Sequence, residues 1–388
     1  MRIVPGIDEI PAGLRFVATV GIFDGMHRGH REVLRATVRA AERIDAAPLV
    51  LTFEPHPETV LRGVTPTLLC DPAEKLARFE AAGVELTVVQ RFDRDFSDQN
   101  AEDFLDRLRR GRALAGLVMS SESAFGRDRQ GTAQTVRRLA NQEGWDLVEL
   151  PVLERAGGRV SSGRIRERIE SGRLDVARRL LGRRYAVSGE VVHGDRRGHL
   201  LGYPTANLAF EAPVTLPPDG IYAVRVTWRE SAETPAGPAP LLPDRISLGV
   251  AALGVRPTFG GGHRLLEVHL LDFDGDLYGT RLRVEFVRYQ RGERRFSGAD
   301  ALVRQMGRDA ARSREILARA REGLATVMET GDEAGREVRS GAWRPAANGA
   351  GLLRVDMRDG LSAAEAMAWA LTYAREVEVV KLASVPGA

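Results

Sequence analysis

The 388-residue sequence predicts the α/β plus β class: a doubly wound parallel-sheet domain, then an antiparallel β-barrel domain closed by a helix, and a small α/β extension. In the first half, short apolar runs alternate with helical patterns, which favours βαβ units and a parallel sheet. Beyond residue 183, short alternating runs follow one another between turn residues without intervening helices, which favours a barrel or sandwich. We therefore expect domains at residues 1–183, 184–325 and 326–388.

Strands and helices alternate along the first half. Apolar runs predict strands at 16–20, 49–53, 86–89 and 115–119. Helical periodicity predicts helices at 33–41, 74–82 and 101–109. A sheet of this kind binds ligands at the carboxyl ends of its strands.

The second half consists mainly of strands. They are expected at 185–192, 222–228, 246–252, 265–273 and 282–287, and a helix at about 298–321 closes the region. The proline-rich segment 229–244 predicts a mobile loop. A Gly- and Arg-rich linker, 331–351, precedes an expected strand, helix and strand for which the sequence suggests no function.

Composition and charge narrow the class of partner. The chain is 43% hydrophobic and 28% charged, and no stretch approaches the roughly 18 apolar residues of a membrane helix. The single cysteine, Cys70, cannot form an internal disulfide, so we expect a cytoplasmic protein. Its 56 basic and 53 acidic residues are interspersed, which favours phosphorylated small molecules over nucleic acid or membrane as partners.

A glycine-rich string, Gly21–His30, lies where the first expected strand meets the first expected helix. Its glycines allow a sharp turn and let a phosphate approach the main chain, and the free amides of a helix start favour negative charge. His27 and His30 can point at the same phosphates and donate hydrogen bonds as a phosphoanhydride breaks. The nucleotide-binding candidates here are Gly21, Phe23, Asp24, Gly25 and Gly29.

Two other interpretations of these histidines stay open. A His-x-x-His pair can bind a metal, and His56 could be the third protein ligand that a zinc site needs. Alternatively, both histidines simply cap the helix.

The string resembles the Gly-x-Phe-Asp-Gly-x-His-x-Gly-His signature of the nucleotidyltransferases that make FAD in bacteria. Two further segments, Thr52–Pro57 and Ser161–Arg166, resemble the Thr-Phe-Asp-Pro-His-Pro and Ser-Ser-Thr-x-Ile-Arg stretches of that family. The resemblance implies a Rossmann-like domain with His27 and His30 as catalytic residues. It also implies a phosphate clamp, formed by Ser161, Ser162, Arg164 and Arg166.

Ser161 and Ser162 can also be read as a plain helix cap. The chain departs from the family at Gly163, where the family has threonine. It departs again in Ser120–Gly126, of which only Phe125 and Gly126 match the segment expected to touch the flavin. Phe125 is accordingly the flavin-binding candidate of this domain.

The second string, His193–Asn207, joins a glycine-bearing turn to a proline-fixed segment. Kinase chemistry needs Mg²⁺ and ATP phosphates held together, and Thr205 Oγ can ligate magnesium while Asn207 bonds a phosphate or completes the metal's shell. The string resembles the Gly-Arg-x-Leu-Gly-Phe-Pro-Thr-Ala-Asn signature of riboflavin kinases. That resemblance implies that Gly194 and Gly198 bind nucleotide.

Companion segments follow in the order of the same family. Gly254–Phe259 resembles its Gly-x-Arg-Pro-Thr-Phe stretch, and Arg291–Phe296 resembles its Arg-x-Glu-x-x-Phe stretch. The resemblance implies flavin contacts, which would be made by Arg256, Thr258, Arg291 and Glu293.

Glu267 is the candidate general base of the second half. Glu267 and His269 share one face of their expected strand, while Leu266 and Val268 take the other. A carboxylate that faces the nucleotide pocket can accept the proton of the riboflavin 5′-hydroxyl as its oxygen attacks the γ-phosphorus. A surface Glu–His pair is the alternative.

Together the resemblances imply a bifunctional riboflavin kinase and FAD synthetase, with riboflavin, FMN and ATP as substrates and Mg²⁺ accompanying ATP. Two alternatives remain. One is a riboflavin kinase whose amino-terminal domain binds nucleotide but adenylylates poorly, which Gly163 and residues 120–123 suggest. The other is a non-catalytic flavin- or nucleotide-binding regulator, which the carboxyl-terminal extension suggests. The sequence does not define the oligomeric state.

Overall fold

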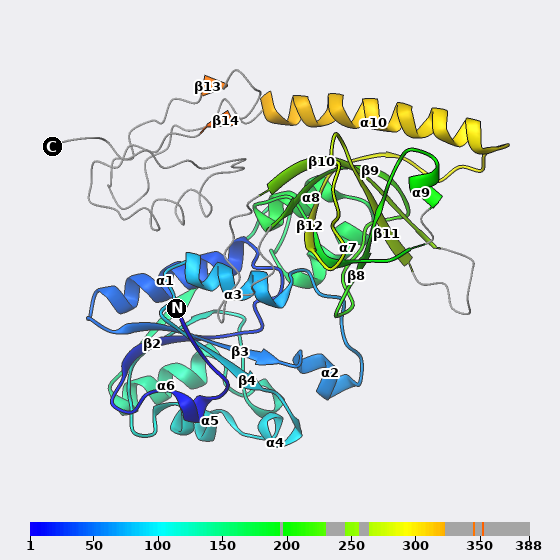
Figure 1. Ribbon diagram of the computed structural model, residues 1–388. Helices are drawn as coiled ribbons and strands as arrows, with labels where there is room; N and C mark the ends of the chain where they lie inside the picture. The colour runs from blue at the N-terminus through cyan, green and yellow to red at the C-terminus, as the bar shows by residue number, and fades with distance from the viewer. Residues whose placement is uncertain (195–196, 230–244, 256–263, 323–343, 346–350, 353–388) are drawn as a thin grey trace.

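The computed structural model describes residues 1–194, 197–229, 245–255, 264–322, 344–345 and 351–352 (Figure 1). Within the last two ranges, β13 (Arg344–Pro345) pairs with β14 (Gly351–Leu352) in antiparallel fashion. The expected proline-rich loop, most of the expected carboxyl-terminal extension, and the candidates Arg256 and Thr258 lie outside these ranges. No helix in the described ranges is long and apolar enough to cross a membrane.

The amino-terminal domain is built on a six-stranded sheet in which every pairing is parallel. Its strands are β1 (Arg2–Val4), β2 (Arg15–Val20), β3 (Ala47–Glu54), β4 (Leu86–Arg91), β5 (Ala113–Ser120) and β6 (Asp146–Leu150). They lie in the order β1-β4-β3-β2-β5-β6, so the strand order reverses between β2 and β5, where sheets of this class bind ligands. The predicted parallel sheet is confirmed, with β1 and β6 as further strands at its two edges.

Helices cover both faces of the sheet (Figure 1). The helices of this domain are α1 (Arg28–Glu42), α2 (Pro57–Arg62), α3 (Pro72–Ala81), α4 (Arg94–Ser97), α5 (Ala101–Arg109), α6 (Ala133–Glu143), α7 (Ser162–Glu170) and α8 (Leu174–Leu181), of which α1 lies on one face and α5 and α6 on the other. Alternation along β2 explains the layers: Val17 packs with Ala40 and Ala41 of α1, whereas Phe16 and Ala18 join the cluster that holds α5 and α6. The doubly wound architecture is therefore confirmed.

The second domain is a closed antiparallel barrel with strand order β10-β11-β8-β7-β12-β9. Its strands are β7 (Ala186–Val192), β8 (Ala206–Ala209), β9 (Gly220–Trp228), β10 (Arg245–Val255), β11 (Arg264–Leu270) and β12 (Arg281–Arg291). A short helix, α9 (Arg197–Leu200), precedes β8, and α10 (Ala299–Glu322) packs against β9, β10 and β12. The barrel and its closing helix confirm the prediction, although β11 ends earlier than expected because Asp272 adopts a left-handed φ of 57°.

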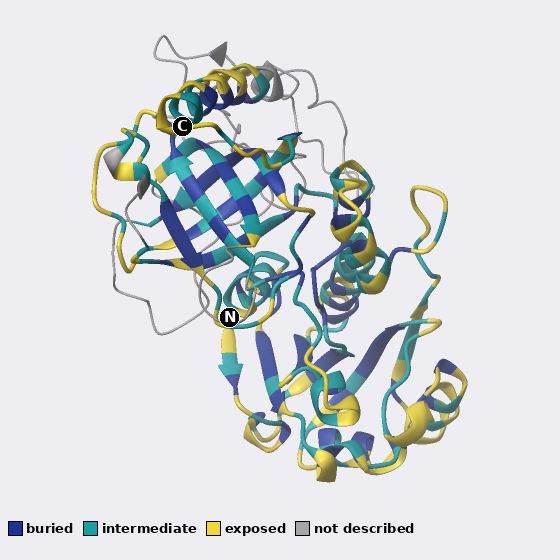
Figure 2. Ribbon diagram, turned by 90° about the vertical axis from the view of Figure 1, so that its right-hand side faces the viewer, coloured by how far each residue is buried: buried dark blue, intermediate teal, exposed yellow. Residues whose placement is uncertain are grey.

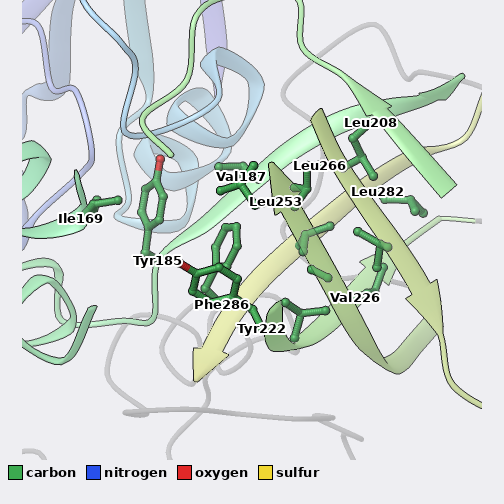
Figure 3. Packing of buried hydrophobic residues seen from close by; sticks show 14 of the residues in the cluster. Ile169, Tyr185, Val187, Leu208, Tyr222, Val226, Leu253, Leu266, Leu282 and Phe286 are labelled. Carbon is green, nitrogen blue, oxygen red and sulfur yellow. The ribbon is translucent and has the colours of Figure 1, made fainter. Parts of the chain in front are cut away.

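Buried and partly exposed residues alternate along the barrel strands (Figure 2). The buried side chains form one cluster that also takes in α7 and α8, for example Ile169 beside Tyr185 and Phe286 (Figure 3). The two helices that end the amino-terminal domain therefore share a hydrophobic core with the barrel.

A short segment of the amino-terminal domain also pairs with the barrel domain. Leu68 forms an isolated parallel bridge with Val214, and the Leu68 main-chain N–H donates to Pro213 O at 2.7 Å. Tyr185 Oη donates to Thr215 O at 2.6 Å beside this bridge. The segment Thr67–Leu69 thus links the two domains.

Candidate active sites

The turn after β2 has the conformation that its glycines predict. Gly25 has φ of 79°, and a Cβ there would also press on the Leu69 side chain at 3.0 Å. Phe23 and Met26 take positive φ angles of 56° and 40° as well, so the chain turns sharply between β2 and α1. Gly21 begins the turn, and its N–H donates to Leu51 O at 3.0 Å.

The two predicted catalytic histidines stack at the start of α1. Their ring centroids are 3.6 Å apart, and the main-chain N–H of His30 donates to His27 Nδ1 at 3.2 Å. Gly29 lies between them, and a Cβ there would come within 3.2 Å of the His27 ring. The capping interpretation therefore holds for His27, and it leaves Nε2 as the protonated nitrogen of the neutral ring.

Their surroundings favour the neutral form of both histidines. Burial lowers the pKa of His27 to about 3, and the nearby Arg183 and Arg31 act in the same direction. Burial also lowers the pKa of His30 well below its usual value, and its Nδ1 has no hydrogen-bond partner among the described residues. The pair can therefore donate hydrogen bonds to a phosphate but brings little charge of its own.

Asp24 ties the turn to two other segments. Its Oδ1 accepts from the Leu69 main-chain N–H at 2.9 Å, and its Oδ2 accepts from Arg166 at 2.6 Å. Burial raises the pKa of Asp24, against the opposing effects of Arg166 and the Leu69 N–H. Asp24 therefore fastens the turn to α7 and to the segment that meets the barrel.

The start of α7 approaches the same turn. Ser161 caps the helix, because its Oγ accepts from the Arg164 N–H at 3.4 Å, and Ser162 Oγ donates to Asp24 O at 2.9 Å. Arg166 holds Thr67 O at 2.7 Å as well as Asp24. The guanidinium of Arg164 donates instead to carbonyls of the preceding turn, those of Arg155, Ala156 and Arg159.

Lys75 is a residue of this site that the sequence motifs do not include. Its ammonium donates to Thr52 Oγ1 at 3.3 Å, and Thr52 Oγ1 donates to Ile22 O in the glycine-rich turn at 3.2 Å. The rarity of lysine could have drawn attention to this residue, since Lys75 is one of only two lysines in the chain.

The metal interpretation of the histidines gains no support here. His56 caps α2, with its Nδ1 accepting from the Glu58 N–H at 3.2 Å. The described part of the chain contains no group of three or more His, Cys, Asp or Glu side chains that could hold a metal ion. Phe125 lies elsewhere in the domain, beside Phe104 at a centroid distance of 5.0 Å.

The barrel brings together the predicted residues of the second string. A Cβ on Gly194 would overlap the Asn207 side-chain amide, so glycine is required for their close approach. Gly198 O accepts from the Tyr203 N–H at 2.8 Å and closes the turn that leads to Thr205. Asn207 is 7% exposed, and its Oδ1 has no hydrogen-bond partner among the described residues.

Glu267 on β11 is the register partner of Asn207 on β8. Glu267 and His269 are partly exposed while their neighbours Leu266 and Val268 are buried, so the predicted split of faces is confirmed. His269 Nδ1 lies 2.8 Å from Pro204 O, which fixes the strand beside the proline segment.

The remaining flavin candidates lie at the end of β12. Arg291 forms a two-armed ion pair with Asp309 of α10, with a shortest distance of 2.5 Å, and Gln305 also donates to Asp309 at 2.9 Å. Glu293 is exposed, and its carboxylate lies where a Cβ on Gly254 would be. Sequence reasoning missed Asp309, whose pairing with Arg291 bridges β12 and α10.

Comparisons with known proteins agree with this division into two sites. Residues 11–164 match the family model for FAD synthetase, and residues 181–317 match the model for riboflavin kinase. The bifunctional riboflavin kinase/FMN adenylyltransferase of Escherichia coli K12 is 34% identical over 321 residues, which cover 82% of this chain and 98% of that protein. The protein of the same name from Bacillus subtilis 168 is 31% identical over 299 residues, covering 76% and 90%.

Among solved structures, the crystal structure of a macrolide-efflux protein from Streptococcus pneumoniae matches with a TM-score of 0.70 and 28% identity. The match covers 81% of this chain and 98% of that one. Because both family models match in sequence order and the bifunctional relatives align over nearly their whole length, the chain belongs to the family of bifunctional riboflavin kinases/FMN adenylyltransferases.

Proposed function

We propose that the barrel, residues 184–325, phosphorylates riboflavin to FMN, and that residues 1–183 join FMN to AMP from a second ATP. The supporting observation is the pair of separate constellations. A buried histidine pair lies at the glycine-rich turn of the sheet, and Glu267 lies opposite Asn207 on the neighbouring strand of the barrel. Neither constellation contributes a residue to the other, so the two reactions have separate catalytic groups.

In the kinase step, Glu267 accepts the proton of the riboflavin 5′-hydroxyl. The hydroxyl oxygen then bonds to the γ-phosphorus of ATP, and the bond between that phosphorus and the bridging oxygen breaks, so that ADP leaves with the electron pair. Gly194 and Gly198 place main-chain groups close to the phosphates. In this role Glu267 must be ionised before the reaction.

Thr205 and Asn207 suit Mg²⁺ as the companion of ATP. Their side chains offer hard oxygen donors, and the buried Asn207 Oδ1 has no hydrogen-bond partner in the described ranges, as expected of a group that awaits a ligand. When bound, the ion neutralises charge on the phosphates. Asn207 is held for this role by its cross-strand position and by the absence of a side chain at Gly194.

In the adenylylation step, a phosphate oxygen of FMN bonds to the α-phosphorus of ATP, and pyrophosphate leaves with the electron pair. The attacking phosphate is already an anion, so the step needs hydrogen-bond donors more than a base. His27 Nε2–H and a ring N–H of His30 supply such donors, together with amides at the start of α1. Ser162 and Arg166 hold the start of α7 against this turn through Asp24. The proposed phosphate contacts on that side are Ser161, Ser162, Arg164 and Arg166.

The flavin ring is assigned to Phe125 in the first domain and to the end of β12 in the second. Arg291 and Glu293 lie at that end of the barrel, where Glu293 approaches Gly254. Arg256 and Thr258, which lie outside the described residues, are assigned to the flavin by the family resemblance alone. We also infer a cytoplasmic location, because the sole cysteine is unpaired and buried.

Product analysis of the whole protein tests the proposal. Riboflavin incubated with Mg·ATP should yield FMN first and FAD later, with one ADP for each riboflavin phosphorylated and one pyrophosphate for each FAD formed. Accumulation of FMN without FAD would support the alternative in which the chain is a riboflavin kinase only. If neither product forms, the chain is a binding protein and the catalytic assignments fall.

A further inference from the structure

Lys75 projects from α3 towards the glycine-rich turn of the first domain. Its Nζ donates to Thr52 Oγ1 at 3.3 Å, near the carboxyl end of β3. Thr52 Oγ1 in turn donates to Ile22 O at 3.2 Å, in the turn that leads to the histidine pair. The ammonium therefore lies at the edge of the sheet where a parallel α/β fold binds its ligand.

The Lys75 ammonium has donors to spare. An ammonium carries three N–H groups, and Thr52 is the one hydrogen-bond partner that the described residues give it. No described carboxylate lies within 4.0 Å of its nitrogen. Burial lowers the pKa of Lys75, against the opposing charges of Glu54 and Asp24. A partly buried cation with unused donors is stabilised by an anionic ligand.

The other cations described around this site are already committed to protein groups. Arg166 pairs with Asp24, and Arg164 holds main-chain carbonyls. Arg183 donates to Met26 O at 3.1 Å. The two histidines favour the neutral form, and the arginines could bind phosphate only in addition to their protein partners. Among the cations named here, Lys75 is therefore the one with N–H groups to spare for phosphate oxygens.

The neighbouring residue fixes the direction of Lys75. Successive helix residues point about 100° apart, so Glu74 and Lys75 leave α3 in different directions. Glu74 pairs with Arg78 at 2.5 Å and with Arg283 of the barrel at 3.2 Å. This ion cluster docks α3 between the barrel and the turn and so orients the lysine.

We propose that Lys75 is a further catalytic residue of the FAD-forming step, which contacts the triphosphate of ATP and stabilises the departing pyrophosphate. The inference rests on the proposed adenylylation. As the bond between the α-phosphorus and its bridging oxygen breaks, negative charge grows on the pyrophosphate, and the Lys75 N–H groups donate to its oxygens. In this role Lys75 acts as the protonated ammonium, so no proton has to be transferred.

Steady-state formation of FAD from FMN and Mg·ATP by the full chain provides the test, because FMN is not a substrate of the kinase site. We compare Lys75→Met, which removes the charge at similar length, with Lys75→Arg, which keeps it. Arg39→Met is the matched control, since it removes one charge from the exposed far end of α1. Riboflavin phosphorylation by the same preparations reports that each variant is folded.

Lys75→Met should lower kcat/KM for ATP in FAD formation by about 100-fold, and Lys75→Arg should restore most of it, while kinase activity stays at the wild-type level. In the reverse reaction of FAD with pyrophosphate, Lys75→Met should raise KM for pyrophosphate about tenfold and leave KM for FAD unchanged, which a folding defect would not do.

Two results would overturn the assignment of Lys75 while leaving the proposed function intact. One is wild-type-like FAD formation by Lys75→Met. The other is an equal loss in Lys75→Met and Lys75→Arg, which would indicate packing rather than charge. Absence of FAD formation in the wild type would instead refute the proposed adenylylation, and the role of Lys75 with it.

Discussion

Glu267 and Asn207 face each other across adjacent antiparallel strands of the barrel. Directly opposed residues on such strands have Cβ atoms about 5 Å apart, so the candidate base and the candidate metal ligand are fixed within one cross-strand step. On its other side Glu267 is the register partner of Ala252 on β10.

Replacing Glu267 with glutamine should therefore stop proton transfer without changing the shape of the site. We expect Glu267→Gln to lower kcat for riboflavin phosphorylation by about 10²- to 10⁴-fold and to leave FAD formation from FMN unchanged. Thr205→Ala should affect the same step alone. Glu190→Gln on the exposed face of β7 is the matched control. Equal loss of both activities would contradict the separation of the sites.

Gly194 tests the position of Asn207. An added Cβ would overlap the Asn207 amide, so Gly194→Ala must displace that side chain. Overpacking of this kind costs about 1–3 kcal/mol, and we expect kcat/KM for riboflavin phosphorylation to fall by about tenfold or more. Gly298→Ala, where a Cβ meets nothing within 4 Å, should leave kcat/KM for riboflavin phosphorylation unchanged. A silent Gly194→Ala would show that Asn207 is not needed where it lies.

The histidine pair should matter for FAD formation alone. Loss of one transition-state donor typically lowers the rate by about 10²- to 10³-fold, so His30→Ala should slow FAD formation by this factor and spare the kinase. His27→Ala should do the same. Discontinuous assays of FAD and FMN on each purified variant would measure both effects.

The low pKa of His27 makes stability depend on pH. In the unfolded chain the imidazole binds a proton near pH 6.5, whereas burial lowers the folded pKa to about 3. Between these two pH values the unfolded state binds more protons than the folded state. The free energy of unfolding is therefore unaffected by the titration of His27 above pH 6.5, and it falls by up to about 1.4 kcal/mol per pH unit as the pH drops below that value.

His27→Asn keeps a side chain that can cap α1 but removes this titration. Denaturant unfolding at pH 7, 6 and 5 should therefore show a shallower loss of stability in the variant than in the wild type. Parallel curves for the two proteins would mean that His27 is not held neutral.

Because Glu74 of the first domain pairs with Arg283 of the barrel, the rate of FAD formation should depend on a residue of the other domain. Burial opposes ionisation of Glu74, but Arg283, Arg78 and Arg183 outweigh it and hold its pKa well below the usual range. Arg283→Met removes one of these partners, so we expect a loss of about 1–2 kcal/mol in the free energy of unfolding and slower FAD formation. Arg314→Met breaks an exposed pair with Asp272 and should change neither by much.

Cys70 provides an independent measurement of the same contact. Burial raises the pKa of its thiol to about 12, so labelling of the native protein by a disulfide reagent should be slow. Arg283→Met should speed the labelling if the contact opens. Unchanged labelling together with unchanged FAD formation would show that the cluster has no such role.

The sequence predicts what is encoded locally. Gly21–His30 combines a turn and a helix start in one string, so its structure could be anticipated, as could the exposed face of Glu267. The sequence does not predict β8, because its strand character comes from pairing with β7 and β11, which lie elsewhere in the chain. β6 is short and carries two acids, so its apolar pattern is weak.

Long-range electrostatic partners were outside the reach of the sequence. Glu74 and Arg283 are 209 residues apart, and no local pattern links them. The arginines of the expected phosphate clamp belong to a recognisable sequence motif. Only the structure shows that Arg166 donates to Asp24 and that Arg164 donates to main-chain carbonyls. The sequence does not indicate Lys75, because its helix carries no motif. The position of that helix also depends on the ion pair between Glu74 and Arg283 of the barrel.

Glu74 and Lys75 are neighbours on α3 but point in different directions, which has a consequence for hybrid enzymes. A chimaera that takes its first half from this chain and its barrel from a relative would inherit Glu74 together with whatever residue the relative has in place of Arg283. Where that residue is not a cation, the graft would leave a carboxylate undercompensated one position from Lys75. Compatible halves should therefore be recognised by matching these two positions rather than by overall identity.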